Sequence, residues 1–334
     1  VNGPEALADG GDFFTGFITS NAESYIWMLV FMAIVFVIVG LGVKGGIEKA
    51  NLFMMPALII MAVAIAIYTL TMPGAVEGAL YYLTPDFSKF SPELVIGALG
   101  QMFYSLSLAM GIMITYGSYV KPEVNLNRAV NQIEIFDTGV ALLAGAMIIP
   151  AVYVFSGTEG MSVGPSLMFV SLPKVFAGMG KAGNVVGILF FVTTIFATLT
   201  SCISVLESIT ANCMEIFHTG RKKTVLVLTV IYLTASAVIA LGYSIFYFEV
   251  KLPNGSTGQL LDIMDYISNS FMMPLISLLS TILIGWIVTP DYVIDEMERN
   301  GEHFRRKKMY TVMIRFVAPV MMLILFLQST GILF

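Results

Sequence analysis

Charged residues are scarce in this sequence. They account for 12% of its 334 residues, whereas soluble domains carry about 25%. So few charges cannot cover a water-exposed surface of this size, which excludes an ordinary soluble globular protein. Hydrophobic residues make up 57% of the chain, and we expect much of their surface to face lipid.

Cysteine and histidine are also rare. Cys202 and Cys213 both fall in one apolar segment, so a disulfide framework is not expected. His218 and His303 lie in predicted loops, where we expect them to be solvated rather than bound to a metal. The sequence shows no nucleophile–base pattern and no phosphate-binding glycine loop, so we do not expect an enzyme.

Eight apolar segments are long enough to cross a bilayer, which takes about 20 residues. They are residues 25–43, 51–72, 93–119, 133–156, 185–216, 224–248, 261–288 and 311–334. Backbone polar groups in lipid must be satisfied within each segment, so these segments are predicted to be helices. The predicted fold class is an all-α membrane protein, a multi-span helical bundle forming one transmembrane domain over residues 1–334.

The basic residues are distributed unevenly among the loops. One set of alternate loops holds 13 of the 17 lysines and arginines, and the positive-inside rule makes that set cytoplasmic. Lys307 and Lys308 are therefore interpreted as topology and lipid contacts, not as nucleic-acid contacts. Residues 1–24 would lie outside. Their polar, glycine-rich sequence predicts a loop, and a chain that starts at Val1 is interpreted as a fragment.

Small and polar residues crowd the middle of the third span. The run from Gly100 to Gly111 reads GQMFYSLSLAMG, and Pro92 precedes it. A helix interrupted there would expose carbonyl groups at the end of its outer half, which suit a cation or a substrate ammonium group. Small residues that let helices pack closely are the alternative interpretation.

The fifth span carries a second polar stripe. Residues 197, 200, 201, 204 and 208 recur at helical spacing and share one face. The Ala197 carbonyl with the Thr200 and Ser201 hydroxyls would offer three oxygens, the ligand type that hard cations prefer. Hydroxyls that bond back to their own helix are the alternative.

Asp137 is one of the few acids well inside an apolar segment, together with Glu207 and Asp265. An unpaired carboxylate in hydrocarbon costs several kcal/mol. Since no lysine or arginine in the spans is placed to pair with Asp137, a metal cation or a proton is the expected companion. The role of Glu207 stays open, and Asp265 could be solvated at a helix end.

Several of these stretches resemble the neurotransmitter:sodium symporter family, particularly its bacterial amino-acid transporters. They are GQMFYSLSL at 100–108, ITYGSY at 114–119, LTS at 199–201 and DIMD at 262–265. The resemblance implies two five-helix inverted repeats, with the first three helices absent and the broken helix around 105–111. The implied location is the plasma (inner) membrane; residues 1–24 would then be extracellular or periplasmic.

The resemblance also implies roles for individual residues. Substrate contacts would come from Tyr104, Ser105, Ser107, Met110, Ser201 and Val205. Sodium ligands would come from Ser105, Asp137, Ala197, Thr200 and Ser201. Asp265 resembles the acid of the outer gate and Glu215 that of the inner gate, with arginine partners outside this chain.

Asp137 departs from the pattern of chloride-dependent family members, which have asparagine there. Gln101 and Ser105 of their chloride site are kept, whereas the last position is Ala141. A fixed carboxylate would supply the charge that chloride supplies elsewhere, so we expect no chloride requirement.

The predicted function is sodium-coupled symport of an amino acid. The apolar pocket residues Met110 and Val205 predict that this amino acid is hydrophobic or aromatic. A proton-coupled transporter using Asp137 and a non-transporting membrane sensor on the same scaffold are the alternatives. Expected partners are an amino-acid substrate and the lipid bilayer, with no nucleic acid; a homo-oligomer is left open.

Overall fold

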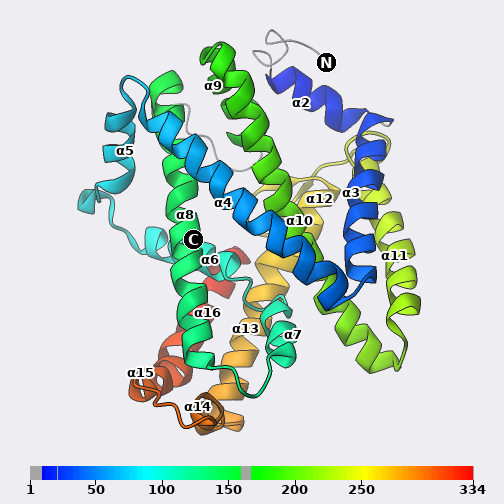
Figure 1. The fold of residues 1–334 in the computed structure, drawn as a ribbon, viewed down its shortest axis with the longest axis vertical. Helices are drawn as coiled ribbons and strands as arrows, with labels where there is room; N and C mark the ends of the chain where they lie inside the picture. The colour runs from blue at the N-terminus through cyan, green and yellow to red at the C-terminus, as the bar shows by residue number, and fades with distance from the viewer. Residues whose placement is uncertain (1–9, 21, 159–166, 334) are drawn as a thin grey trace. The chain divides into compact units, whose positions relative to one another are not determined.

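The computed structural model describes residues 10–20, 22–158 and 167–333, and their regular structure is almost entirely helical (Figure 1). Seven helices in these ranges are long and apolar enough to span a membrane: Glu23–Gly40, Val43–Leu70, Leu126–Ser156, Lys181–Phe217, Arg221–Leu241, Leu260–Ile287 and Lys307–Ser329. The remaining predicted span, 93–119, is divided between two shorter helices. The predicted all-α membrane fold with one broken helix is therefore confirmed.

Two compact units make up the chain. The first comprises Val1–Ser88, Thr138–Leu206 and Cys213–Ala240, and the second comprises Lys89–Asp137, Glu207–Asn212 and Leu241–Phe334. Two long helices, α8 (Leu126–Ser156) and α10 (Lys181–Phe217), contribute residues to both units.

The first unit is built on long apolar helices. Besides its parts of α8 and α10 it contains α2 (Gly10–Thr19), α3 (Glu23–Gly40), α4 (Glu48–Leu70), α5 (Ala75–Leu83), α9 (Leu172–Gly178) and α11 (Arg221–Leu241), with π-helical turns at Val43–Ile47 and Leu167–Ser171. Its core is centred on Phe176 and Phe190, whose rings lie 5.5 Å apart. Close packing of such side chains is what holds the helices of a membrane protein together.

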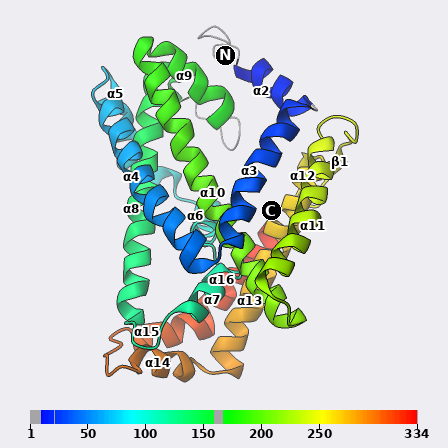
Figure 2. The same ribbon diagram turned by 45° about the vertical axis from the view of Figure 1, so that its right-hand side comes forward.

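The second unit contains the broken helix and the carboxy-terminal helices. Its elements are α6 (Pro92–Ser105), α7 (Ile112–Tyr119), α12 (Leu260–Asp265), α13 (Met273–Ile282), α14 (Pro290–Glu298), α15 (Lys307–Val312) and α16 (Ala318–Ser329), with a hairpin of β1 (Val250–Lys251) and β2 (Thr257–Gly258). π-Helical turns occupy Tyr266–Met272, Leu283–Ile287 and Met313–Val317. Phe103 of α6 packs with Met273 of α13 and with Met322 and Leu325 of α16. Figure 2 shows α13 and α16 next to each other.

Two of these π-helical turns bond to each other. The Arg315 guanidinium donates from Nε to the Gly285 carbonyl at 3.0 Å, and the Trp286 indole donates to the Arg315 carbonyl at 3.0 Å. A π-helical turn displaces carbonyls from the regular helical ladder, and these side chains provide donors for them. These two hydrogen bonds stabilise Arg315 inside a spanning segment. Arg315 has no ion-pair partner among the described residues.

Several predicted boundaries were wrong. The amino-terminal loop was predicted over 1–24, but α2 occupies Gly10–Thr19; residues 1–9 and 21 lie outside the described residues. The helix predicted from 133 begins at Leu126, because Asn125 caps it by accepting the Arg128 backbone N–H at 2.7 Å. The helix predicted to reach 248 ends at Leu241, before Gly242.

Candidate functional site

The polypeptide backbone is interrupted between α6 and α7. Helical structure stops at Ser105 and resumes at Ile112. Between them, Ser107, Ala109 and Gly111 adopt left-handed conformations with φ of 52°, 62° and 75°. For serine and alanine this conformation costs about 1–2 kcal/mol each, so the surrounding structure must stabilise it.

This interruption leaves backbone oxygens without the usual helical partners. The amides of Leu106, Ser107 and Leu108 still donate to carbonyls in the last turn of α6. Within the described residues, however, no backbone amide donates to the carbonyls of residues 105–110. Irregular backbone at membrane depth is tolerated where it lines a cavity or is buried in protein. The break therefore presents carbonyl oxygens that can meet a positive charge.

Gly111 fixes the start of α7 against α10. A Cβ atom at this position would lie 2.9 Å from the Ser208 hydroxyl oxygen, and φ is +75°. One turn further on, the Thr115 and Ser208 hydroxyls are 3.1 Å apart and both side chains are buried. The close approach requires glycine, because a side chain would be strained in its backbone and crowded by Ser208.

Two of the predicted sodium ligands are in direct contact. The Ser105 hydroxyl, at the last residue of α6, donates to Asp137 Oδ1 of α8 at 2.6 Å. Among the described residues Asp137 has no ion-pair partner. A half-buried carboxylate with one serine hydroxyl as its donor can accept a cation on its remaining lone pairs. The structure thus places a negative charge directly beside the broken helix.

Gln101 lies one helical turn before Ser105 on α6. The Gln101 side chain is exposed. The described hydrogen bond of Asp137 is with Ser105 and not with Gln101. The spacing of four residues puts Gln101 on the same face as Ser105. Its predicted role beside Asp137 stays a prediction.

The polar stripe on α10 belongs to an unbroken helix. The Thr200 hydroxyl donates to the Ala197 carbonyl at 2.8 Å, and the Ser204 hydroxyl donates to the Thr200 carbonyl at 2.9 Å. Both hydroxyls therefore bond to carbonyls of their own helix, as the alternative to cation binding predicted. They do not exclude cation binding, because each oxygen keeps a second lone pair. Ala197 and Ser201 are exposed on this helix.

The predicted substrate contacts fall in both units. Tyr104, Ser107 and Met110 flank or lie in the helix break of the second unit, whereas Ser201 and Val205 lie in the first. The Tyr104 side chain is 50% exposed. Met110 packs against the core that contains Phe103, so part of its apolar surface is already used by the second unit.

The predicted gate acids show different local environments. Asp265, the last residue of α12, accepts a hydrogen bond from the Asn269 amide at 2.6 Å. Glu215 is exposed in the last turn of α10. Neither has an ion-pair partner among the described residues. Their roles as gates stay predictions.

Glu207, whose role the sequence left open, is fully buried in α10. Its carboxylate Oε1 accepts a hydrogen bond from the Tyr119 hydroxyl of α7 at 2.8 Å. Sequence reasoning missed Tyr119 as this partner. The available signal was the spacing of Thr115 and Tyr119, which places both on the face of α7 that meets Ser208 and Glu207.

Among the described residues, no group of three histidine, cysteine, aspartate or glutamate side chains forms a metal site. Cys202 and Cys213 are free thiols. A broken helix with an adjoining carboxylate inside apolar spans is instead typical of multi-span membrane transporters.

Comparison with known proteins specifies the class. Residues 18–332 match the sodium:neurotransmitter symporter family. The chain is 33% identical over 328 residues to the sodium-dependent transporter YhdH of Bacillus subtilis, covering 98% of this chain and 71% of that protein. The chain belongs to the sodium:neurotransmitter symporter family, which is a family of transporters and not of enzymes.

Other relatives support the same membership. The sodium-dependent transporter MJ1319 of Methanocaldococcus jannaschii is 28% identical, covering 91% of this chain and 61% of that protein. The crystal structure of MhsT in complex with L-phenylalanine superposes with a TM-score of 0.81 at 35% identity, covering 96% of this chain and 71% of MhsT. The chain therefore spans 61% to 71% of the length of these three relatives.

Proposed function

We propose that the protein carrying this chain is a sodium-coupled symporter of a hydrophobic or aromatic amino acid. The main support is the contact between Ser105 and Asp137, which places a carboxylate without a basic partner against a helix break that exposes carbonyl oxygens. A monovalent cation bound there would balance the carboxylate charge and be coordinated by oxygen alone. Family membership supports sodium as that cation.

A second sodium would bind at Ala197, Thr200 and Ser201 of α10. The substrate ammonium group would meet the broken backbone near Tyr104, Ser105 and Ser107, where helix carbonyls carry partial negative charge. Sodium and substrate are coupled because each binds the same outward-facing state better in the presence of the other. Closure at Asp265 and opening at Glu215 would then release both inside.

The proposed substrate class depends on the apolar character of Met110 and Val205. An unbranched thioether adapts to the shape of an apolar or aromatic side chain. The complex of the neighbour MhsT with L-phenylalanine supports an amino acid of this kind. Tyr104, in the same unit as Met110, would cover a bound substrate with its ring.

Uptake into proteoliposomes tests the proposed function. The full-length protein is reconstituted and given labelled phenylalanine, leucine and lysine under an inward sodium gradient, with choline replacing sodium in the control. We expect phenylalanine or leucine to accumulate only with sodium. Accumulation driven equally well by a pH gradient in choline would favour the proton-coupled alternative, and binding without accumulation would favour a sensor.

We further propose that transport does not require chloride. The Asp137 carboxylate would provide the negative charge that offsets sodium. Replacing chloride by gluconate at constant sodium should leave the initial uptake rate unchanged. A rate that falls with chloride removal would contradict this part of the proposal while leaving sodium coupling intact.

A further inference from the structure

A polar pocket of about 620 Å³, open to the surface and hereafter called the cavity, lies in the second unit, away from the helix break. It is lined by Asn125, Asn127, Arg128, Asn131, Gln132, Ile135, Glu302, His303 and Arg305. Asn125 caps α8, the next five residues belong to the first turns of that helix, and the others belong to the connection between α14 and α15. None of them has a role in the proposed transport.

The position of the cavity relates it to the membrane surface. Two spanning helices begin at its rim, because α8 starts at Leu126 and the last span starts at Lys307. In Figure 1, α14 and α15 lie beside the end of α8 that carries these residues. Helix ends that enter the bilayer lie at the level of the lipid headgroups. The positive-inside prediction places this end in the cytoplasmic leaflet.

The charges around the cavity are mixed. Arg128 and Arg305 each contribute a guanidinium group, and the first turns of the 31-residue helix α8 add a positive dipole end. Glu302 contributes the opposing charge, and its Oε2 is buried without a hydrogen-bond partner among the described residues. The lining therefore suits a ligand that joins a phosphate to an ammonium group.

Surrounding contacts hold both walls of the cavity in place. On the α8 side, Arg306 pairs with Glu134 at 3.7 Å. On the other side, the Asn300 amide donates to the Pro122 carbonyl at 2.6 Å. These bonds fasten the 299–306 connection to the chain beside α8, so the cavity is formed before any ligand binds.

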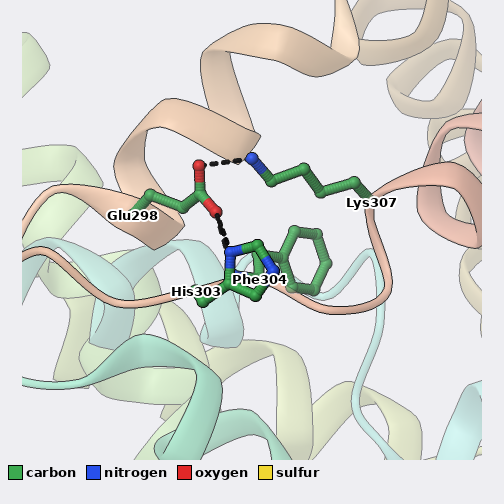
Figure 3. A network of polar contacts seen from close by, with 4 residues as sticks. All are labelled: Glu298, His303, Phe304 and Lys307. Carbon is green, nitrogen blue, oxygen red and sulfur yellow. Dashed lines mark hydrogen bonds and ion pairs between the residues drawn. The ribbon is translucent and has the colours of Figure 1, made fainter.

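Glu298 braces the same connection from within (Figure 3). Its carboxylate accepts bonds from Lys307 Nζ at 2.5 Å and from the Phe304 amide at 2.9 Å, and His303 Nδ1 lies 3.7 Å away. The hydrogen bond from Lys307, followed by that from Phe304, holds the pKa of Glu298 below its ordinary value. Glu298 therefore stays ionised near neutral pH, and its contacts with His303, Phe304 and Lys307 hold this part of the connection against α14.

We propose that this cavity binds the phosphoethanolamine group of a membrane phospholipid. The phosphate would accept hydrogen bonds from Arg128 and Arg305, and the primary ammonium group would pair with the carboxylate of Glu302. The amides of Asn127, Asn131 and Gln132 can donate to the remaining phosphate oxygens. The acyl chains would leave the rim toward the bilayer that α8 and α15 enter.

The chemistry of Glu302 makes the proposal selective. A phosphocholine group carries no N–H donor, so it could not donate a hydrogen bond to the Glu302 carboxylate. A phosphoglycerol group has no positive charge to balance that carboxylate. We expect the ethanolamine lipid to bind roughly tenfold more tightly than either, the ratio that one charge-assisted hydrogen bond provides.

Titration of short-chain lipids into the purified full-length protein tests the inference. Dihexanoyl phospholipids with ethanolamine, choline or glycerol headgroups are compared by calorimetry, and soluble phosphoethanolamine is the fourth ligand. Ethanolamine selectivity among the lipids supports the proposal. Tighter binding of soluble phosphoethanolamine than of its lipid would point to a free metabolite and overturn the lipid assignment.

Matched variants locate the binding site. Glu302→Gln should remove the ethanolamine preference, Glu302→Asp should retain part of it, and Arg128→Gln should weaken all three lipids. The controls are Glu296→Gln and Arg299→Gln, which change the same charges on an exposed pair at the carboxyl end of α14, outside the cavity. Equal effects of Glu302→Gln and Glu296→Gln would overturn the proposal. Because binding is measured without transport, its failure would not bear on the symport proposal.

Discussion

The helix break of α6 and α7 and the unbroken helix α10 offer oxygen atoms to a cation in two different ways. In the break, no described backbone amide donates to the carbonyls of residues 105–110. The Asp137 carboxylate lies beside them, where it accepts a hydrogen bond from Ser105. In α10, the Ala197 carbonyl and the Thr200 hydroxyl stay bonded to each other. The first arrangement frees oxygen atoms, whereas the second only leaves lone pairs available.

This difference has an energetic consequence. The break requires left-handed backbone at Ser107 and Ala109, which costs about 1–2 kcal/mol for each residue. The stripe on α10 requires no backbone strain. A site that depends on strained backbone should be sensitive to conformational substitutions, whereas the site on α10 should respond to the loss of a single side-chain oxygen.

The largest effect is expected from Gly111→Ala, which sharpens the comparison at the break. The new methyl group would sit at φ +75° and 2.9 Å from Ser208 Oγ, so the protein should lose roughly 1–3 kcal/mol of stability and most of its uptake. Thermal unfolding and sodium-driven uptake are the measurements. Gly117→Ala is the control, because that glycine lies within α7 and has nothing within 4 Å of the added carbon.

A stable, active Gly111→Ala protein would show that the break tolerates a side chain at its last residue. In that case the close approach to Ser208 would not be needed for the conformation. Reduced stability in Gly117→Ala would instead show that α7 is generally fragile. The comparison between break and helix would then lose its basis.

Asp137→Asn should have the next largest effect. Removing the carboxylate charge should weaken sodium binding at the broken helix by roughly 10- to 100-fold, as for the loss of a charged hydrogen-bonding group. The sodium dependence of uptake would shift to higher concentration, and chloride should partly restore it. Glu134→Gln, one turn earlier on the exposed face of α8, is the control. Unchanged sodium dependence in Asp137→Asn would contradict the role of this carboxylate.

Much of the break could be predicted from the sequence. Serine and glycine in the middle of an apolar span, after Pro92, indicated an interruption between Ser105 and Gly111, and the structure confirms it. The identity of the strained residues could not be predicted. Ala109 takes a left-handed conformation that alanine ordinarily avoids, and only the packing around it stabilises that choice.

Contacts between distant segments were the least predictable. The hydrogen bond from Tyr119 to Glu207 joins residues 88 positions apart, and apolar periodicity carries no information on such pairs. The start of α8 was missed for a related reason. Its first turns are polar, so a prediction based on apolar length begins too late, although the capping residue Asn125 marked the true start.

The smallest effect is expected from Thr200→Val, which tests the helical stripe. Valine keeps the shape of threonine but removes its hydroxyl oxygen, so the sodium concentration for half-maximal uptake should rise a few-fold, corresponding to about 0.5–1.5 kcal/mol. Thr198→Val is the matched control, since Thr198 also donates to a carbonyl of its own helix, at 2.9 Å to Thr194.

Both threonine substitutions remove one hydrogen bond within α10, so their effects on helix stability should cancel in the comparison. Thermal unfolding without sodium should therefore be similar for the two proteins, and only Thr200→Val should lose stabilisation when sodium is added. If Thr198→Val shifted the sodium dependence equally, the hydroxyls would act through the helix and not as ligands. The stripe on α10 would then be a packing feature, and the broken helix would be the only one of the two regions that supplies oxygen atoms to sodium.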